Sequence, residues 1–272
     1  MTPSILAGKR GIISGALDQN SIAWKVAEKA HAAGAKFTLT NAPIAMRMGE
    51  IKNLAEKCQS EIIPADATNV AELEHLFSHS QEVLGGKIDF VLHSIGMSAN
   101  IRKNIPYPEL NYDFYMKSLD VSALSLHKML SVAMRLDAIS EWGSVVALSY
   151  IAAQRTFPFY TDMAEAKALL ESITRSFGYH YGKKRKVRVN TVSQSPTKTT
   201  AGSGIKGFGS FFEFADSISP LGNATADSCA DYCITLFSDY TRMVTMQNLF
   251  HDGGYSFTGI SDEVMNTFVP EG

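Results

Sequence analysis

Cysteine is scarce in this sequence, with three residues among 272, namely Cys58, Cys229 and Cys233. Three unpatterned cysteines are too few for a disulfide framework. Cys229 and Cys233 lie four apart on an expected helix, and no histidine or third cysteine lies near them in the sequence. Zinc sites need about four such ligands, so we expect reduced core thiols and no metal site.

Long apolar runs and a strong charge of one sign are also missing. No stretch approaches the roughly 18 uninterrupted apolar residues of a membrane helix, and the N-terminal apolar run is too short for a signal peptide. We therefore expect a cytoplasmic protein with no membrane contact. A net charge of −2 does not provide the excess of positive charge that is typical of nucleic-acid-binding proteins. The basic run Lys183-Lys184-Arg185-Lys186 is expected to be a solvated turn, with contact to an acidic carrier protein as the alternative.

A full Gly-x-Gly-x-x-Gly turn is absent as well. The first expected strand, 11–14, is followed by a single glycine, Gly15, which alone is a weak nucleotide-binding motif. The helix that begins near Ser21 and Ile22 still offers free backbone N–H groups to a pyrophosphate.

What is present is a regular alternation of short apolar strands and amphipathic helices. We expect strands at 11–14, 35–40, 61–63, 88–93, 144–148, 187–192 and 246–250. Helices are expected between them at 22–31, 51–58, 70–84, 112–136, from 161 onward, and 227–237. This order predicts a single α/β domain over 1–272, of Rossmann type, with a doubly wound parallel sheet of about seven strands and helices on both faces.

Two irregular segments, 97–112 and 196–219, follow the carboxyl ends of expected strands. Open α/β sheets bind their ligands at these ends. The second segment is rich in glycine and phenylalanine, a composition that suits a mobile apolar lid over a substrate. A helix hairpin packed on the core is the alternative.

Tyr160 and Lys167 are the strongest candidates for chemistry. They lie seven residues apart, about two helical turns, so their side chains leave one face of a helix. A nearby ammonium favours the phenolate, so we expect Lys167 to assist proton donation by Tyr160. Taken alone, such a pair also fits a solvated helix face.

The pattern Tyr150-x9-Tyr160-x6-Lys167, after a Leu-Ser strand end and with Pro158 and Met163 between, resembles the signature of bacterial enoyl-acyl-carrier-protein reductases. These are a divergent branch of the short-chain dehydrogenase/reductase family. The resemblance extends from Gly8 to Gly254. It implies hydride transfer to the β-carbon of a trans-2-enoyl thioester in type II fatty acid synthesis, with Tyr150, Tyr160 and Lys167 as catalytic residues. Tyr160 would stabilise the enolate.

The resemblance also implies a coenzyme site. Its residues would be Gly15, Ser21, Ile22, Asn41, Asp66, Ala67, Ser94, Ile95, Gly96, Lys167, Pro196 and Thr199. Asn41 stands where an acidic residue selects NAD and an arginine selects NADP. We expect NADH, with NADPH possible through Arg47. For Asp66, a helix-capping role is the alternative.

For the substrate, the resemblance implies contacts with Met97, Ser98, Tyr150, Met163, Ile205 and Phe208, and a lid at about 197–219. It further implies an acyl-carrier-protein-bound thioester and a homotetramer. Gln194-Ser195 departs from the family's Ala-Gly, and the serine is expected to crowd the nicotinamide. Thr161-Asp162 and Ala164-Glu165 also differ from the family's common residues around Met163, and these differences are expected to alter positioning and the accepted chain length.

Two other functions stay open on the sequence. A carbonyl or alcohol dehydrogenase of the same superfamily also uses tyrosine and lysine, but in the spacing Tyr-x-x-x-Lys, and Ala164 stands at that position here. A non-catalytic nucleotide-binding protein on the same fold is the second. The presence of both Tyr160 and Lys167 argues against it.

Overall fold

The computed structural model describes residues 4–47, 50–203 and 207–268. Its centre is a sheet of seven parallel strands in the order β3-β2-β1-β4-β5-β6-β7. The strands are β1 Arg10–Ser14, β2 Lys36–Thr40, β3 Glu61–Ile62, β4 Ile88–His93, β5 Ile139–Ser149, β6 Arg188–Gln194 and β7 Asn248–His251. The predicted doubly wound α/β fold is confirmed.

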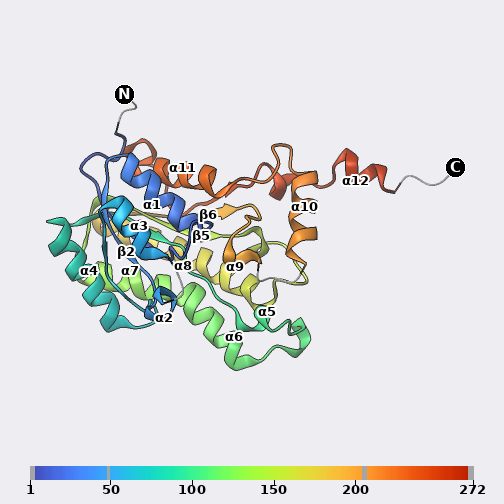
Figure 1. The fold of residues 1–272 in the computed structure, drawn as a ribbon, viewed down its shortest axis with the longest axis horizontal. Coiled ribbons are helices and arrows are strands. Elements are labelled where there is room, and N and C mark those ends of the chain that lie inside the picture. Colours follow the sequence, from blue (N-terminus) through green and yellow to red (C-terminus); the bar gives the residue numbers. More distant parts are fainter. Residues whose placement is uncertain (1–3, 48–49, 204–206, 269–272) are drawn as a thin grey trace.

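Helices cover both faces of this sheet (Figure 1). One face carries α1 Ile22–Ala32, α3 Ile51–Cys58 and α11 Ala226–Phe237, and the other carries α4 Val70–Leu84, α7 Ser125–Arg135 and α8 Thr161–Arg185. Each face buries its own apolar cluster, because strands covered on both sides must be apolar on both sides. No helix in the described ranges is both long and apolar enough to cross a bilayer.

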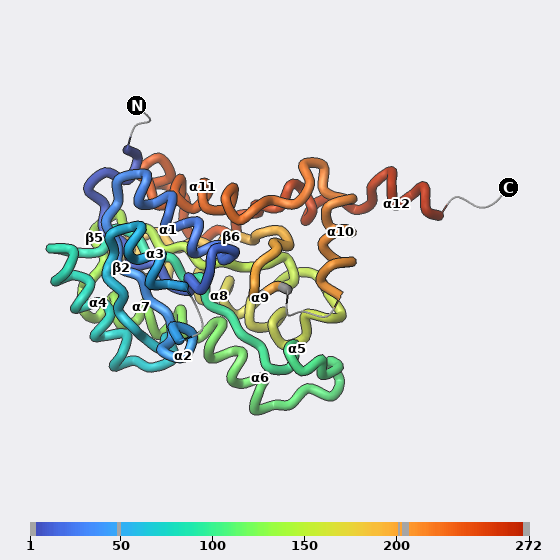
Figure 2. Tube along the Cα trace, in the orientation of Figure 1, coloured from blue at the N-terminus to red at the C-terminus, as the bar shows by residue number. Residues whose placement is uncertain are grey.

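The shorter elements gather beyond the carboxyl ends of the strands, at the right of the molecule in Figure 2. They include α5 Ala99–Arg102, α6 Tyr112–Leu119, α9 Thr200–Ser203 and α10 Phe208–Ile218. The other short elements are α2 Pro43–Met46, α12 Asp262–Asn266 and the 3₁₀ turns Tyr107–Glu109, Ile151–Ala153 and Tyr255–Phe257. The 3₁₀ turn Asp239–Thr241 lies instead at the amino end of β6, where Arg188 donates to Thr241. The two segments expected to be irregular therefore contain short helices.

The helix expected over 112–136 is not one regular α-helix. Residues Asp120–Leu124 form a π-helical turn between α6 and α7. Ser125 Oγ donates to the Val121 carbonyl (2.7 Å), and Ser122 Oγ leaves the helix to bond both backbone groups of Met97. A π turn of this kind re-aims side chains, and such turns are frequent at functional sites.

The basic run is also placed differently from the prediction. Lys183, Lys184 and Arg185 form the last turn of α8, where cations stabilise the helix dipole. Only Lys186 lies outside, with φ 57° at the helix end. Strand β5 is longer than predicted and begins at Ile139, with Trp142 at φ 65° and a register shift against β4.

Candidate active site

The turn after β1 is shaped by a close contact with β4. Gly15 has φ 92°, and a Cβ there would lie 1.9 Å from the Ser94 carbonyl oxygen. Only glycine fits both the left-handed backbone and this approach. Gly15 and Ser94, two predicted coenzyme residues, therefore lie against each other at the ends of neighbouring strands.

Ser21 lies at the start of α1 and braces the same turn. Its Oγ donates to the Asp18 carbonyl (2.8 Å) and accepts from the Leu17 N–H (3.3 Å). No side chain caps the helix that Ile22 begins. The first N–H groups of α1 remain suited to a phosphate, as the sequence predicts.

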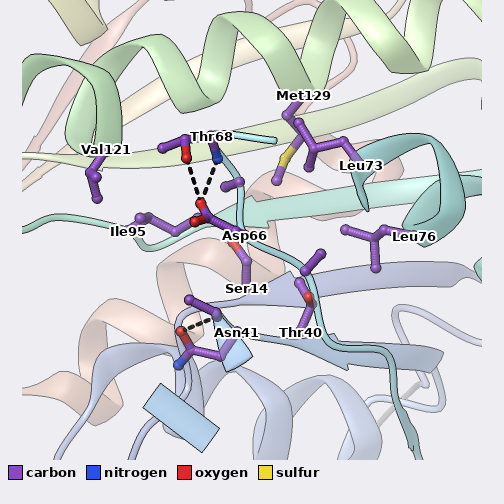
Figure 3. A pocket seen from close by; sticks show the side chains of 13 residues that line it. Ser14, Thr40, Asn41, Asp66, Thr68, Leu73, Leu76, Ile95, Val121 and Met129 are labelled. Carbon is purple, nitrogen blue, oxygen red and sulfur yellow. Dashed lines mark hydrogen bonds between the residues drawn. The ribbon is translucent and has the colours of Figure 1, made fainter. Parts of the chain in front are cut away.

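A pocket lies between the ends of β1 and β2 and the segments after β3 and β4 (Figure 3). It is lined by predicted coenzyme residues, Asn41, Asp66, Ala67 and Ile95, together with Ser14, Thr40, Leu73, Leu76 and Met129 among others. Asn41 Nδ2 donates to the Ala16 carbonyl (3.0 Å), which joins this pocket to the Gly15 turn. The lining, apolar on one side and polar at Asp66, suits a flat heterocycle with one polar edge.

Asp66 is held at this polar edge by Thr68. Its Oδ1 accepts from the Thr68 N–H (2.8 Å) and the Thr68 hydroxyl (2.7 Å). Partial burial acts to raise the pKa of Asp66, but these bonds outweigh it and the pKa falls below its usual value. The helix cap is Asn69, whose side chain accepts from two N–H groups of α4. The capping alternative for Asp66 is therefore wrong.

Tyr160 lies at the N-terminal end of α8, and its ring packs 5.1 Å from that of Tyr150. Burial raises the pKa of Tyr160 well above its usual value. Lys167 Nζ donates instead to the Leu148 carbonyl (2.8 Å). The expected shift of Tyr160 toward phenolate is therefore wrong, because desolvation of the phenol decides the direction. The phenol of Tyr160 therefore stays protonated at neutral pH.

Lys167 is buried beneath Gly96. A Cβ on Gly96 would lie 3.8 Å from Lys167 Nζ and 3.9 Å from Met163 Cε, which is van der Waals contact, so both side chains lie directly against Gly96. Burial lowers the pKa of Lys167 to about 8, and the carboxylate of Glu171 opposes this fall. The predicted Lys167 and Gly96 thus meet in one place.

Glu171 is a buried residue that sequence reasoning missed. Its Oε1 accepts from Ser149 Oγ (2.7 Å) and its Oε2 from Gln154 Nε2 (3.1 Å). The only signal was its position four residues after Lys167, one turn further along the same helix.

Tyr150 is the centre of an aromatic cluster. Its ring lies 5.4 Å from Phe157 and 6.2 Å from Phe211, and Phe157 and Phe211 both approach Tyr255. Burial raises the pKa of Tyr150, and its hydroxyl has no hydrogen-bond partner within the described part of the chain. A buried hydroxyl without a partner marks a place where a bound group can complete its bonding.

Phe157 and Tyr255 were missed, and Phe211 was expected only as part of the lid segment, while the predicted Phe208 takes another position. Phe208 packs on Phe212 (6.1 Å), on a different side of α10 from Phe211. The sequence signal for Phe211 is its helical spacing with Ala215 and Ile218, because residues at this spacing share one face of a helix, and here that face is the buried one. Ile205 lies outside the described residues.

Of the other predicted substrate residues, Met163 lies in an apolar cluster with Ile101 and Ala166, against which Tyr160 packs. Met97 is held by its backbone to Ser122 Oγ (3.0 Å). The Ser98 hydroxyl points into the protein and donates to Asp162 (2.7 Å), so it is committed to an internal bond.

After β6, Pro196 is buried, and Thr199 Oγ1 accepts from the Gly202 N–H (3.0 Å). Ser195 Oγ accepts from the Ala224 N–H (2.7 Å), so this side chain turns toward Ala224 and is occupied there. Gln194 bonds Thr197 and His251. The two departures from the family pattern thus serve bonds inside the protein. No group of three or more potential metal ligands occurs in the described ranges.

Comparison with known proteins agrees with this geometry. Residues 15–256 match the family model described as enoyl-(acyl carrier protein) reductase. The chain is 30% identical over 256 residues to the enoyl-[acyl-carrier-protein] reductase [NADH] FabI of Bacillus subtilis, covering 93% of this chain and 98% of that protein. It is 32% identical over 259 residues to enoyl-[acyl-carrier-protein] reductase [NADH] 1 of Rhizobium meliloti, covering 94% and 93%.

Solved structures give the same result. The FabI-NADH complex from Alistipes finegoldii superposes with a TM-score of 0.96 at 59% identity, covering 99% of this chain and 95% of that one. The enoyl-[acyl-carrier-protein] reductase (NADH) from Aquifex aeolicus superposes with a TM-score of 0.87 at 28% identity, covering 94% and 100%. The chain therefore belongs to the enoyl-(acyl carrier protein) reductase family.

Proposed function

We propose that this protein uses NADH to reduce the carbon–carbon double bond of a trans-2-enoyl thioester carried on acyl carrier protein. The observation that carries this function is the placement of Tyr160. Its phenol is a neutral donor beside the Tyr150 cluster, while Lys167 bonds the Leu148 carbonyl under Gly96. The Tyr160 phenol thus lies on the substrate side of the proposed site, and the Lys167 ammonium lies on the coenzyme side.

The residues present fit a dinucleotide. The tight Gly15 turn and the uncapped start of α1 suit a pyrophosphate, and the pocket at Asp66 suits an adenine ring. NADH, when bound, supplies the hydride. Gly15, Ser21, Ile22, Asn41, Asp66, Ala67, Ser94, Ile95 and Gly96 would hold its adenosine and pyrophosphate half, with Pro196 and Thr199 at the other end.

Tyr160 would donate a hydrogen bond to the thioester oxygen, where negative charge develops as an enolate. Because burial keeps the phenol protonated, the donor is present over the whole neutral pH range. A donor placed toward developing charge contributes about 3 kcal/mol in favourable sites. Lys167 would hold ribose hydroxyls, and Tyr150 would line the acyl pocket together with Met97, Met163 and Phe211, which takes the place expected for Phe208.

The segment at about 197–219 would close over the acyl chain as a lid, since α10 contributes Phe211 to the Tyr150 cluster. The basic run does not support carrier-protein docking. It ends α8, whose 25 residues extend about 37 Å from Tyr160. We further propose that the protein works in the cytoplasm as a homotetramer.

Tyr160→Phe tests the function directly. Loss of the phenol hydrogen bond should reduce kcat for a 2-enoyl thioester by about a hundredfold. The dissociation constant for NADH, followed by coenzyme fluorescence, should stay the same, because only a transition-state interaction is lost.

The matching control for the reaction is a 3-keto thioester assayed with the unaltered protein. Faster turnover of the keto substrate than of the enoyl substrate would assign the protein to the carbonyl dehydrogenases and overturn the proposal.

A further inference from the structure

A fully buried carboxylate lies two residues after Tyr160. Asp162 has 0% exposure, and within the described part of the chain it forms no salt bridge. Burying a carboxylate without a cation is costly unless hydrogen bonds replace its hydration. Asp162 is also one of the residues around Met163 that depart from the pattern that the family resemblance implies.

Three neutral donors surround this carboxylate. Oδ1 accepts from Ser98 Oγ (2.7 Å) and Thr161 Oγ1 (3.0 Å), and Oδ2 accepts from Asn100 Nδ2 (2.9 Å). All three donor residues are themselves buried. The arrangement is a closed internal network, and a fully satisfied network of this kind fixes its members in one geometry.

The network reaches across the substrate side of the site. Asn100 exchanges two bonds with the backbone of Asn111, donating to its carbonyl (3.3 Å) and accepting from its N–H (3.1 Å). Asn111 in turn caps α6 by accepting from the Phe114 N–H (3.0 Å). Asp162 therefore ties the beginning of α8 to the whole stretch from Ser98 to the start of α6.

Thr161 gives a second, independent sign of constraint. This β-branched residue has φ 34°, a left-handed conformation that costs free energy for such side chains. Strain of this kind persists only where the surroundings hold it. Thr161 links Tyr160 to Asp162, and its hydroxyl is bonded to the Asp162 carboxylate.

The apolar wall beside Tyr160 depends on the same tie. Ile101, on α5, packs with Met163 and Ala166, and Tyr160 packs against this cluster. The Ile101 N–H donates to Ser98 Oγ (3.1 Å), the same hydroxyl that donates to Asp162. Ile101 is therefore placed next to Tyr160 through two consecutive hydrogen bonds.

We propose that Asp162 is a positioning residue. It sets the direction of the Tyr160 phenol through Thr161 and the width of the acyl pocket through Ser98, Asn100 and Ile101. It thereby selects the acyl chains that reach Tyr160. This inference rests on the proposed enoyl reductase function.

The first test is Asp162→Asn. An amide keeps the Oδ1 acceptor but points an NH₂ group at Asn100 Nδ2, and Asn100 cannot reverse its own amide without breaking both bonds to Asn111. We expect kcat for a 2-enoyl thioester to fall by about tenfold or more, since small misplacements at a reacting centre are costly. The ratio of kcat/KM between a long-chain and a short-chain substrate should change too. NADH affinity should not change, because no proposed coenzyme residue bonds Asp162.

Rescue is tested by the exchanged pair Asn100→Asp with Asp162→Asn. The new amide at 162 can donate to the new carboxylate at 100, so kcat should exceed that of either single variant. Such coupling in a double-mutant cycle is the signature of a direct contact. Ser80→Ala is the control, because it removes a buried hydroxyl bond to Thr38 (2.8 Å) in another part of the sheet. It should lower stability and leave kcat unchanged.

Unaltered kcat and chain-length preference in Asp162→Asn would overturn the inference, and so would effects of the two substitutions that simply add. If the unaltered protein itself fails to oxidise NADH with a 2-enoyl thioester, the proposed function falls, and this inference falls with it.

Discussion

Lys167 is a buried ammonium whose charge depends on its neighbours. Burial lowers its pKa to about 8, which lies near the neutral range. Glu171, on the same helix, opposes this fall, and His93, at the end of β4, is the other titratable side chain close to the ammonium. Burial lowers the pKa of His93 to about 3, so the imidazole is neutral at ordinary pH. Glu171 is left as the charge that keeps Lys167 protonated.

Glu171→Gln should therefore move the alkaline limit of coenzyme binding. The amide still accepts from Ser149, and Gln154 can reverse its own amide, so the hydrogen bonds survive while the negative charge is lost. The pKa of Lys167 then falls further, and its charged form disappears at lower pH. We expect the loss of NADH affinity with rising pH to begin about one pH unit earlier, as measured by fluorescence titration from pH 6 to 9.

The control for that shift is Glu165→Gln, which removes a carboxylate from the preceding part of α8. Glu165 accepts from the Tyr107 hydroxyl (2.7 Å) and has no part in the Lys167 environment. Identical pH profiles for Glu171→Gln and the unaltered protein would show that Glu171 does not act on Lys167.

At the scale of elements, α10 presents two aromatic faces with different roles. Phe211 meets Tyr150 and Phe157, whereas its neighbour Phe212 packs on Phe208 and lies under the Lys198 ammonium (4.2 Å). The lid hypothesis therefore predicts a difference between two adjacent phenylalanines.

Phe211→Ala should raise KM for a long-chain enoyl thioester by about tenfold, equivalent to about 1.4 kcal/mol, because it removes part of the acyl-pocket wall. Phe212→Ala should raise it much less. Steady-state kinetics of both variants with long and short substrates measures the difference. Equal effects of the two changes would assign α10 to general packing and not to the substrate.

The alternation of elements could be predicted because strands covered on both faces must be largely apolar, as the run Val145-Val146-Ala147-Leu148 within β5 is. The π turn at Asp120–Leu124 could not, since it depends on Ser122 reaching Met97, a residue 25 positions away. Strand β5 was predicted too short because its first part, Ile139–Gly143, mixes polar and apolar residues and contains a left-handed Trp142.

Within the site, Tyr150, Tyr160 and Lys167 were predicted because their motif is a spacing along the chain, which can be read directly from the sequence. For Asp162, the sequence showed only a departure from the family pattern. Its buried hydrogen-bond network could not be predicted, because the donors Ser98 and Asn100 are brought to it by the fold. The state of Tyr160 was predicted wrongly for the same reason. Its desolvation and the bond from Lys167 to Leu148 are properties of the packed molecule.

At the scale of the whole molecule, the C-terminal segment extends away from the sheet toward the right of Figure 1. It exposes large apolar side chains at Phe257 (78%), Ile260 (54%), Met265 (54%) and Phe268 (76%). Apolar side chains gathered on a projecting segment are typical of protein interfaces. This surface supports the proposed homotetramer.

The paired change Ile260→Lys and Phe268→Lys should therefore lower the molar mass in light scattering from that of a tetramer to that of a dimer or monomer. Charged side chains cannot be buried in an apolar interface without a partner. Val83→Lys on α4, also an exposed apolar position (41%), is the control and should leave the mass unchanged. A tetramer that persists in the paired variant would place the interface elsewhere.

The strand order has a consequence for the path by which the chain folds. Strand β1 is central and pairs with β2 and with β4, whose partner residues lie about 80 positions further on, as in Gly11 with Phe90. During synthesis β1 and β2 can pair early, but the Gly15 turn meets Ser94 only after β4 has emerged from the ribosome. Pairings so distant in sequence slow folding. Because Met129 of α7 also lines the adenine pocket, this half of the site would be completed only after α7 has emerged as well. From that point on, coenzyme binding would favour completion of the fold.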